Sequence, residues 1–336
     1  MALNKIPGRV YLLVAIAIFA ASSSVGSKLA EIGRANLIDG RNPISFCNVL
    51  FIGNLCALIV LIAVYGREWQ AESFTRLSLI NWLVLILVAV LSSTIAPSLT
   101  FFALENTNAS NVVLISRIQS PLTFAFLSLI LGKKSNWWMF AGELISVLGI
   151  ILILILQSSQ ANAIEMMGLS IGRGELLAIG GAIAISVANL TRKIRLDTIP
   201  IGVFTIFRIA VGTIFFYALT VKLYGMEHFA DAFSPFVWQW ISIYGVAIVA
   251  GGQIIWFKGL KTSKFASISY AGYITPIAGI LAAYLILGEV PTKAQYIGGS
   301  VILLGAFFNQ IGIWHEAKKF PSRKFSLDRF IGFKGI

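Results

Sequence analysis

Charged residues are scarce in this sequence. Only 12% of its 336 residues are Asp, Glu, Lys or Arg, whereas 57% are hydrophobic, and the mean hydropathy is +0.86. A soluble domain carries about 25% charged residues. So few charges cannot cover a water-facing surface, and we therefore expect lipid to be the solvent for most of the chain.

Cysteine and histidine are also scarce, with two residues of each kind. Cys47 and Cys56 fall within one apolar run, where they are expected to pack as small hydrophobic side chains and not as a disulfide pair. His228 and His315 lie far apart in the sequence. The sequence therefore provides no cluster of metal ligands, and we predict neither a metal site nor any other cofactor.

Several functional motifs are missing. The sequence has no HExxH zinc motif and no phosphate-binding loop, which argues against a membrane-embedded enzyme and against transport driven by ATP hydrolysis. It also lacks the carbonyl-rich loop or acidic ring that an ion channel uses as a selectivity filter. Any transport would have to draw on a gradient of the substrate, of protons or of another ion.

Long apolar runs dominate what is present. A spanning helix needs about 20 apolar residues, because the hydrocarbon core is about 30 Å thick and each residue rises about 1.5 Å. A β-barrel would instead show alternating segments of about ten residues. Because backbone polar groups in lipid must be satisfied within the segment, we predict ten transmembrane helices. The runs are 9–30, 43–65, 80–104, 109–131, 138–157, 174–193, 201–221, 236–257, 266–287 and 294–313.

The first run follows Lys5 and Arg9 and could be mistaken for a cleaved signal peptide. It is longer than the core of a typical signal, and nine further runs follow it. We therefore interpret it as an uncleaved first helix.

The formal charge of +12 is distributed unevenly. If the N-terminus is cytoplasmic, the cytoplasmic segments hold 18 Lys and Arg residues and the outer loops hold 6. This bias predicts a cell-membrane protein with both termini in the cytoplasm, and it requires no nucleic-acid partner. The basic tail at 314–336 is either a solvated segment that enforces this topology or one that lies on anionic lipid headgroups.

The two halves of the chain resemble each other. Both the fourth and the ninth run contain a proline about eleven residues before a closing glycine, and in both halves two further glycines follow at spacings of ten and seven. Five helices per repeat is an odd number, so the second repeat must insert upside down, as in secondary transporters. Alternatively, duplication only builds a stable scaffold, with glycines that permit close packing. The matching residues are Pro121, Gly132, Gly142 and Gly149 in the first half, and Pro276, Gly288, Gly298 and Gly305 in the second.

Specific segments resemble a known family. The stretch Phe102-Ala103-Leu104-Glu105-Asn106-Thr107-Asn108-Ala109-Ser110 is similar to the "ALxxTSAS" junction of the EamA-type drug/metabolite transporters. The stretch from Gln119-Ser120-Pro121 to Leu131-Gly132 is similar to the helix that follows this junction, and the second half repeats both features through Gly259-Leu260, Thr275-Pro276 and Leu287-Gly288-Glu289. The resemblance covers 9–313. It implies a first five-helix repeat at 9–157, a second at 174–313, and a central cavity for small metabolites.

The first half departs from the family pattern at two places. The acidic residue after the closing glycine is Glu289 in the second half, but Lys133 in the first. The family often has an arginine in the second helix of a repeat. Arg208 fits this pattern, whereas Asn48 and Val49 lie near the corresponding place in the first half.

Three ionisable residues fall inside predicted helices, where charge is costly. Arg117 and Arg208 are candidates to bind a carboxylate or phosphate of the substrate by a bidentate fork. Alternatively, Arg117 forms a structural ion pair, for instance with Glu143, and Arg208 is a structural arginine of the family. Glu143 is a candidate for binding a coupling proton, or else a paired structural residue.

Further polar residues and prolines suggest a shared lumen. The candidates for substrate contact are Gln119, Asn189, Gln253, Tyr270 and Tyr273, and each could instead make hydrogen bonds between helices. Pro97, Pro121 and Pro276 each remove a backbone hydrogen bond and are candidate kinks.

Together these features predict an all-α membrane protein that works as a secondary transporter. We expect it to export or exchange small polar metabolites, such as amino acids, by alternating access. The alternative is a non-transporting membrane scaffold. The expected partners are the substrate and membrane lipid, and a homodimer is also possible.

Overall fold

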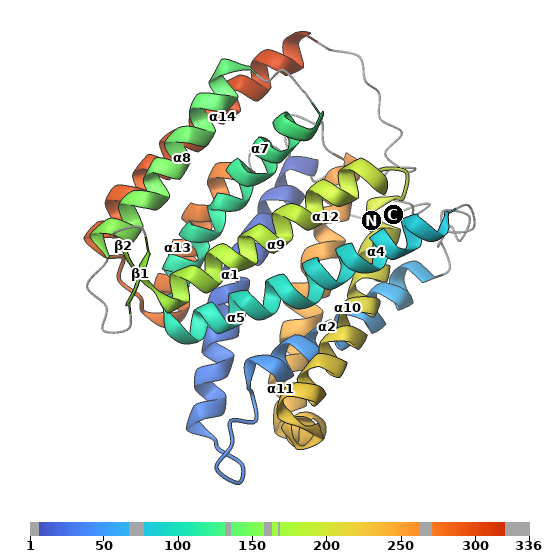
Figure 1. The fold of residues 1–336 in the computed structure, drawn as a ribbon. Helices are drawn as coiled ribbons and strands as arrows, with labels where there is room; N and C mark the ends of the chain where they lie inside the picture. The colour runs from blue at the N-terminus through green and yellow to red at the C-terminus, as the bar shows by residue number, and fades with distance from the viewer. Residues whose placement is uncertain are drawn as a thin grey trace.

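The computed structural model describes residues 7–66, 77–131, 136–157, 163–166, 169–262 and 271–319, and these are almost entirely helical. Figure 1 shows long helices stacked side by side. In the first half these are α1 (Gly8–Ala35), α2 (Phe46–Tyr65), α4 (Leu79–Val90), η3 (Leu91–Ile95), α5 (Ala96–Asn106), α6 (Ala109–Ile115), η4 (Ser116–Ile118), α7 (Gln119–Leu131) and α8 (Trp137–Leu156). In the second half they are α9 (Arg173–Arg195), α10 (Ile201–Tyr224), η5 (Met226–Phe233), α11 (Pro235–Ile243), η6 (Tyr244–Gly251), α12 (Gly252–Thr262), α13 (Ala271–Leu287) and α14 (Lys293–Lys319).

The predicted spans agree with these elements. Within the described residues, eight helices are long and apolar enough to cross a membrane, with α4–η3–α5 and α11–η6–α12 each counted as one continuous helix. The remaining two predicted runs, at 109–131 and 266–287, correspond to α6–η4–α7 and to α13. The prediction of an all-α membrane fold is confirmed.

Side-chain caps fix where several helices begin. Ser45, Ser78 and Ser234 each accept a hydrogen bond from the backbone N–H three residues ahead, at the start of α2, α4 and α11. Asn136 accepts one from the N–H of Trp138 at the start of α8. Such caps satisfy N–H groups that have no partner inside the helix, so each of these apolar runs has a defined beginning.

Helices α8 and α14 show how the two halves are related. They lie side by side in Figure 1. A Cβ added at Gly142 would lie 2.6 Å from the Gly305 carbonyl oxygen, and one at Gly149 would lie 2.7 Å from the Gly298 carbonyl oxygen. The helices are therefore antiparallel. Because Gly142 matches Gly298 in the repeat and Gly149 matches Gly305, exchanging the halves maps this contact onto itself, as an inverted repeat requires.

The remaining helices interlock across the repeats in the same symmetric way. The first helix of each repeat packs on the third and fourth segments of the other, so α1 contacts α12 and α13 while α9 contacts α5 and α7. The second helices follow this pattern too, with α2 against η6 and α10 against η3. Neither repeat therefore buries its own faces alone, and the predicted pair of inverted five-helix repeats is confirmed.

The third segment of each repeat is interrupted at a similar place. Leu91–Ile95 and Tyr244–Gly251 are π-helical, so the backbone hydrogen bonds there span five residues instead of four. Short π-helical segments occur frequently at functional sites. Both segments border the cavity described below.

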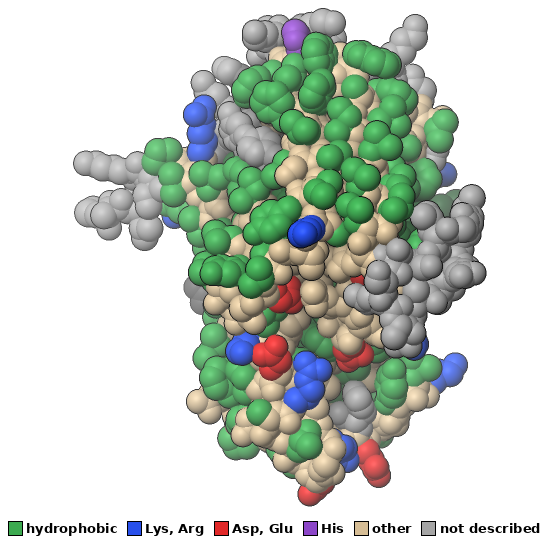
Figure 2. All heavy atoms as spheres, turned by 90° about the vertical axis from the view of Figure 1, so that its left-hand side faces the viewer, with side chains coloured by type: hydrophobic (Ala, Val, Ile, Leu, Met, Phe, Trp, Pro, Cys, Tyr) green, Lys and Arg blue, Asp and Glu red, His purple; other side chains and the backbone are tan. Residues whose placement is uncertain are grey.

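The outer side of α8 faces the lipid. Figure 2 shows hydrophobic side chains gathered over the upper part of the face on which α8 and α14 lie, with most of the charged side chains below them. The exposed apolar residues of α8 recur at helical spacing and form one stripe, as expected of a surface solvated by hydrocarbon. They are Phe140, Leu144, Leu148, Ile151 and Ile155.

A short hairpin between the repeats was not predicted from the sequence. Strand β1 (Ala163–Met166) pairs with β2 (Leu169–Gly172) in antiparallel register, with Glu165 opposite Ser170. Residues 168–172 match the pattern GxSxG, which in hydrolases places the serine at a sharp turn from a strand into a helix. Ser170 lies instead within a paired strand, so this match carries no catalytic interpretation.

The contact between α8 and α14 leads to a prediction on adjacent glycines. A Cβ at Gly298 would lie 2.6 Å from the Gly149 carbonyl oxygen, whereas at Gly299 the nearest atom is Leu114 Cδ2 at 3.7 Å. Gly298→Ala should therefore lower the unfolding temperature in detergent, because overpacking reduces the free energy of unfolding by about 1–3 kcal/mol. Gly299→Ala is the control. It should leave the unfolding temperature unchanged or raise it, because alanine is more favourable than glycine in a helix by about 1 kcal/mol. Equal shifts for the two variants would contradict this packing.

Candidate functional site

A cavity of about 370 Å³ lies between the two repeats, near the middle of the helices. It is bordered by α1, α2, η3, α5, η4 and α7 of the first repeat and by α9, α10, η6 and α12 of the second. Its polar lining residues are Ser22, Ser23, Asn54, Ser92, Ser93, Thr100, Ser116, Gln119, Arg208, Tyr244 and Gln253. Its apolar lining residues include Leu50, Ala96, Pro97, Phe101, Leu104, Ile185, Ile209 and Val249. A cavity of this size accommodates a small metabolite, since pockets for small ligands range from about 300 to 1,000 Å³.

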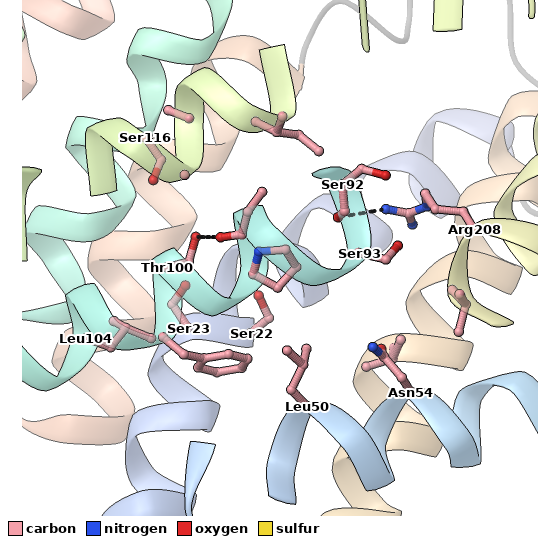
Figure 3. Close-up of a pocket in the computed structure, with 18 of the residues that line it drawn as sticks. Ser22, Ser23, Leu50, Asn54, Ser92, Ser93, Thr100, Leu104, Ser116 and Arg208 are labelled. Carbon is pink, nitrogen blue, oxygen red and sulfur yellow. Dashed lines mark hydrogen bonds between the residues drawn. The ribbon is translucent and has the colours of Figure 1, made fainter. Parts of the chain in front are cut away.

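Arg208 enters this cavity from α10. Figure 3 shows its guanidinium group beside Ser92 and Ser93 of η3. Its one hydrogen bond within the described part of the chain runs from Nη1 to the Ser92 carbonyl oxygen, at 3.5 Å. The Thr94 hydroxyl donates to the Gly212 carbonyl at 2.9 Å and fastens α10 to η3. The fold thus holds an arginine at the cavity wall with most of its five donors unused.

Pro97 explains why the Ser92 carbonyl is available. At the end of η3, the N–H of Ala96 bonds to the Leu91 carbonyl, five residues back. In the same register residue 97 would bond to Ser92, but proline has no N–H group. The Ser92 carbonyl therefore accepts from Arg208 instead. A proline predicted as a kink is thus linked directly to the placement of the cavity's arginine.

A second arginine, Arg192, lies in the last turn of α9. The guanidinium carbon of Arg192 is 4.9 Å from the centre of the Phe204 ring, a cation–π contact. Phe204 is four residues before Arg208 on α10 and therefore on the same helix face. Arg192 Nε is buried and has no hydrogen-bond partner among the residues that the structure describes. A second arginine therefore lies where the ends of α9 and α10 meet, with Asp197 acting on its charge.

Of the residues predicted from sequence, four border the cavity. Arg208, Gln119, Gln253 and Pro97 are among its lining residues. They come from both repeats, as the prediction of a shared lumen requires. Their roles in binding are not tested by this placement and stay predictions.

The other predicted residues lie elsewhere or outside the described part. Arg117 and Asn189 are not among the lining residues, and the Asn189 side chain is exposed. Pro121 lies in the first turn of α7, directly after the 3₁₀ segment η4, and Pro276 lies inside α13. Tyr270 lies outside the described residues, as does the side chain of Tyr273.

Glu143 joins α8 to two other helices. Its Oε1 atom accepts hydrogen bonds from the Ser120 hydroxyl at 2.9 Å and from the Asn309 amide at 2.6 Å. Glu143 is buried, with only 6% of the residue exposed. Among the described residues it forms no ion pair with Arg117, the alternative considered from the sequence. Glu143 is thus a buried carboxyl group held by neutral donors, at the contact between α8 and α14.

A buried polar network closes the bundle at the end where α5 meets α6. The Glu175 Oε1 atom, on α9, accepts from the Thr107 hydroxyl at 2.6 Å and from the Asn111 amide at 3.2 Å. The Asn111 side-chain oxygen Oδ1 accepts from the Gln295 side-chain amide Nε2 of α14 at 2.6 Å. This network links α6 to the first turns of α9 and α14, and therefore ties the two repeats together.

Glu289 makes a second link at the same end. Its carboxylate accepts from the backbone N–H groups of Ala109 and Ser110, at 2.9 and 3.1 Å, and from the Ser110 hydroxyl at 2.9 Å. The acidic residue that follows the closing glycine of the second repeat thus caps a helix of the first. Carboxylates are favoured at such helix starts because the N–H groups there lack partners.

Sequence reasoning missed several of these residues. Asn54 is a polar residue within an apolar helix, a signal that could have identified it. Glu175 and Gln295 lie in the first turns of their helices and resembled ordinary residues of a helix end. Their burial in one network depends on the contact of α6, α9 and α14, which no local pattern reports.

The described residues contain no group of three or more His, Cys, Asp or Glu that could hold a metal ion. Cys47 and Cys56 are both free.

Comparison with known proteins places the chain among transporters. The profile of the EamA-like transporter family matches residues 8–155 and again 172–310. An uncharacterized transporter of Synechocystis sp. is 39% identical over 340 residues, which covers 99% of this chain and 97% of the relative. An uncharacterized transporter of Archaeoglobus fulgidus is 22% identical over 229 residues, covering 68% of this chain and 75% of the relative. A solved crystal structure shares the fold at a TM-score of 0.57 and 16% identity, covering 94% of this chain and 98% of that one.

The link made by Glu289 can be tested by hydrogen exchange. Glu289→Gln leaves one acceptor oxygen for three donors, so buried N–H groups of α6 lose their partner at a cost of about 1–3 kcal/mol. We expect faster exchange of the amides of residues 109–115 and a lower unfolding temperature. Glu227→Gln, at an exposed site, is the control. Unchanged protection of α6 would show that the cap does not stabilise this end.

Proposed function

Because the chain belongs to the EamA-like transporter family and is therefore a multi-pass membrane transporter, we propose that it is a secondary transporter of small polar organic metabolites. It exports or exchanges these compounds, with amino acids among the candidates, by alternating access. The single observation that carries this proposal is the polar cavity between two inverted repeats, with an arginine on its wall. Secondary transporters place their substrate sites at such a repeat interface, near the midplane of the bilayer.

The links at one end of the bundle support alternating access. Glu289 and the network around Glu175 join the repeats on one side of the cavity, and both are built from hydrogen bonds that can break and re-form. In our proposal these contacts form the closed gate of one state. In the opposite state they separate, and the repeats close at the other end.

The charge distribution supports an orientation. Lys and Arg are concentrated in the segments that would face the cytoplasm. We propose that the repeats at 9–157 and 174–313 lie in the cell membrane, with both termini and the tail at 314–336 in the cytoplasm. The end closed by Glu289 then faces outward. A homodimer would have to pair through lipid-facing sides such as the stripe on α8, since the cavity is enclosed by the two repeats of one chain.

Glu143 is our candidate for the coupling proton. A buried carboxyl group with hydroxyl and amide partners can exist with or without a proton, and buried ionisable groups in membrane proteins are often part of proton relays. Its position between α7, α8 and α14 would let a change in its charge alter the contact between the repeats.

The first test is transport into liposomes that contain the purified protein. We expect saturable, competable counterflow of a panel member drawn from amino acids, sugars, nucleosides and organic phosphates. Arg208→Ala should reduce this flux about 10- to 100-fold, since a hydrogen bond to a charged group contributes about 1.5–3 kcal/mol. Arg117→Ala should have a smaller effect, because Arg117 does not line the cavity.

Lys222→Ala is the matched control for this test, because Lys222 is an exposed cation on the same helix as Arg208. Each variant is first checked for folding by its unfolding temperature. The absence of flux for the whole panel, with or without a proton gradient, would favour a non-transporting scaffold. Equal loss in the Lys222 and Arg208 variants would remove Arg208 from the substrate path.

The coupling role of Glu143 has a separate readout. Glu143→Gln keeps the side-chain size and an acceptor for Ser120 and Asn309, but it cannot bind a proton at neutral pH. We expect it to lose accumulation driven by a proton gradient while it retains counterflow, with Glu227→Gln as the control. If gradient-driven accumulation persists, then Glu143 only joins the helices and coupling lies elsewhere.

A further inference from the structure

We infer that the substrate is a small organic anion, held by a carboxylate at Arg208, that carries no compensating ammonium group. This inference rests on the proposed function and narrows it. Within the polar metabolites considered above, it favours carboxylic acids without an amino group over amino acids.

The charge of the cavity gives the first argument. Among the described residues that line it, Arg208 is the one charged side chain, and no Asp or Glu is present. The described lining therefore offers a cation for a carboxylate and no anion for an ammonium group.

The buried acids that the structure describes do not supply the missing anion. Glu143 accepts from Ser120 and Asn309 at the contact of α8 and α14, and Glu175 accepts from Thr107 and Asn111 at the end of the bundle. Neither borders the cavity. An ammonium group placed there would meet only neutral oxygens, and an uncompensated charge away from water is costly.

The donors around Arg208 give the second argument. Its guanidinium group has five N–H donors, and its one hydrogen bond, to the Ser92 carbonyl, is long at 3.5 Å. The Ser93 hydroxyl beside it is buried, in a residue that is 4% exposed, and has no hydrogen-bond partner among the described residues. A carboxylate between these groups would accept from both and so provide the Ser93 hydroxyl with an acceptor. Arginine suits this task because its planar fork matches a carboxylate.

The opposite part of the cavity limits the rest of the substrate. In Figure 3 Leu104 lies away from Arg208, with Leu50 between them. Phe101 also lines the cavity, and the Thr100 hydroxyl already donates to the Ala96 carbonyl at 2.9 Å. Ser22, Ser23 and Ser116 line this part as well, so with a volume of about 370 Å³ the site suits a short body, apolar or with hydroxyl groups, attached to the carboxylate.

Arg192 of α9 lies next to this region. Its guanidinium group contacts Phe204, one turn before Arg208 on α10, and its buried Nε has no hydrogen-bond partner among the described residues. Asp197 also acts on its charge, so the inference rests on Arg208.

The test uses three probes of nearly equal shape: leucine, its 2-oxo acid, and the amine that lacks the carboxylate. Each is measured in liposomes for counterflow and for competition, and in detergent for thermal stabilisation of the wild-type protein. We expect the oxo acid to act at a concentration at least about tenfold lower than leucine, since a tenfold ratio corresponds to only about 1.4 kcal/mol. The amine should have no effect.

Two variants then assign the preference to Arg208. Arg208→Gln should abolish the preference for the oxo acid, and Arg208→Lys should retain part of it, because the charge remains while the fork is lost. Both are accepted only if they unfold near the wild-type temperature, and Lys222→Ala should keep the full preference.

The outcomes separate this inference from the proposed function. Saturable flux of leucine at least equal to that of the oxo acid would overturn the inference and leave a transporter of zwitterions. A preference that survives in Arg208→Gln would also overturn it. If neither flux nor stabilisation is found for any probe, while other members of the wider panel are transported, this site does not bind carboxylates. If nothing at all is transported, both proposals fail.

Discussion

The absence of water in the bilayer is the constraint on which this structure depends, because every polar group there must find its partner within the chain. Helices satisfy most of the backbone, and several buried side chains are paired between the repeats. Glu143 with Asn309, Glu175 with Asn111, and Glu289 with the start of α6 each join elements far apart in the sequence. The same groups therefore satisfy the polar atoms and hold the two halves together. The polar links are concentrated where the repeats meet, and the apolar stripe on α8 faces outward.

The cavity lies where a regular helix is interrupted and a backbone carbonyl loses its usual partner. In η3 the backbone changes to π-helical bonding, and Pro97 provides no N–H for the carbonyl of Ser92. That carbonyl is satisfied by Arg208, which brings a cation from α10 to the wall of the cavity. The second repeat is interrupted at a comparable place, in η6. Irregular backbone at membrane depth is tolerated where it is buried in protein or lines a cavity, and both interruptions lie at this one.

Much of the fold could be predicted from the sequence, whereas the site could be predicted only in part. The lengths of the apolar runs predicted the ten helical segments, and the repeated glycines predicted the inverted relation of the two halves. Both signals can be recognised because they are local or periodic in the sequence. Arg208, Gln119 and Gln253 stood out as polar residues within apolar runs, and they line the cavity. Asn189 stood out for the same reason but is exposed, since a single sequence does not report which face of a helix meets the lumen. Glu175 and Gln295 were missed because their importance arises from the contact of three separate helices.

The symmetry of the scaffold and the asymmetry of the site have different physical causes. The glycine contacts of α8 and α14 serve packing, and both partners of a two-fold contact must stay small, so the matching glycines occur in both repeats. A substrate with one carboxylate needs one arginine. A second arginine at the equivalent place of α2 would add a buried cation without a partner, at considerable cost. The first repeat has no arginine in α2, and its closing glycine is followed by Lys133, where the second repeat has Glu289. The first repeat thus lacks the arginine that a single carboxylate would leave unpaired, while the packing of the two repeats stays symmetric.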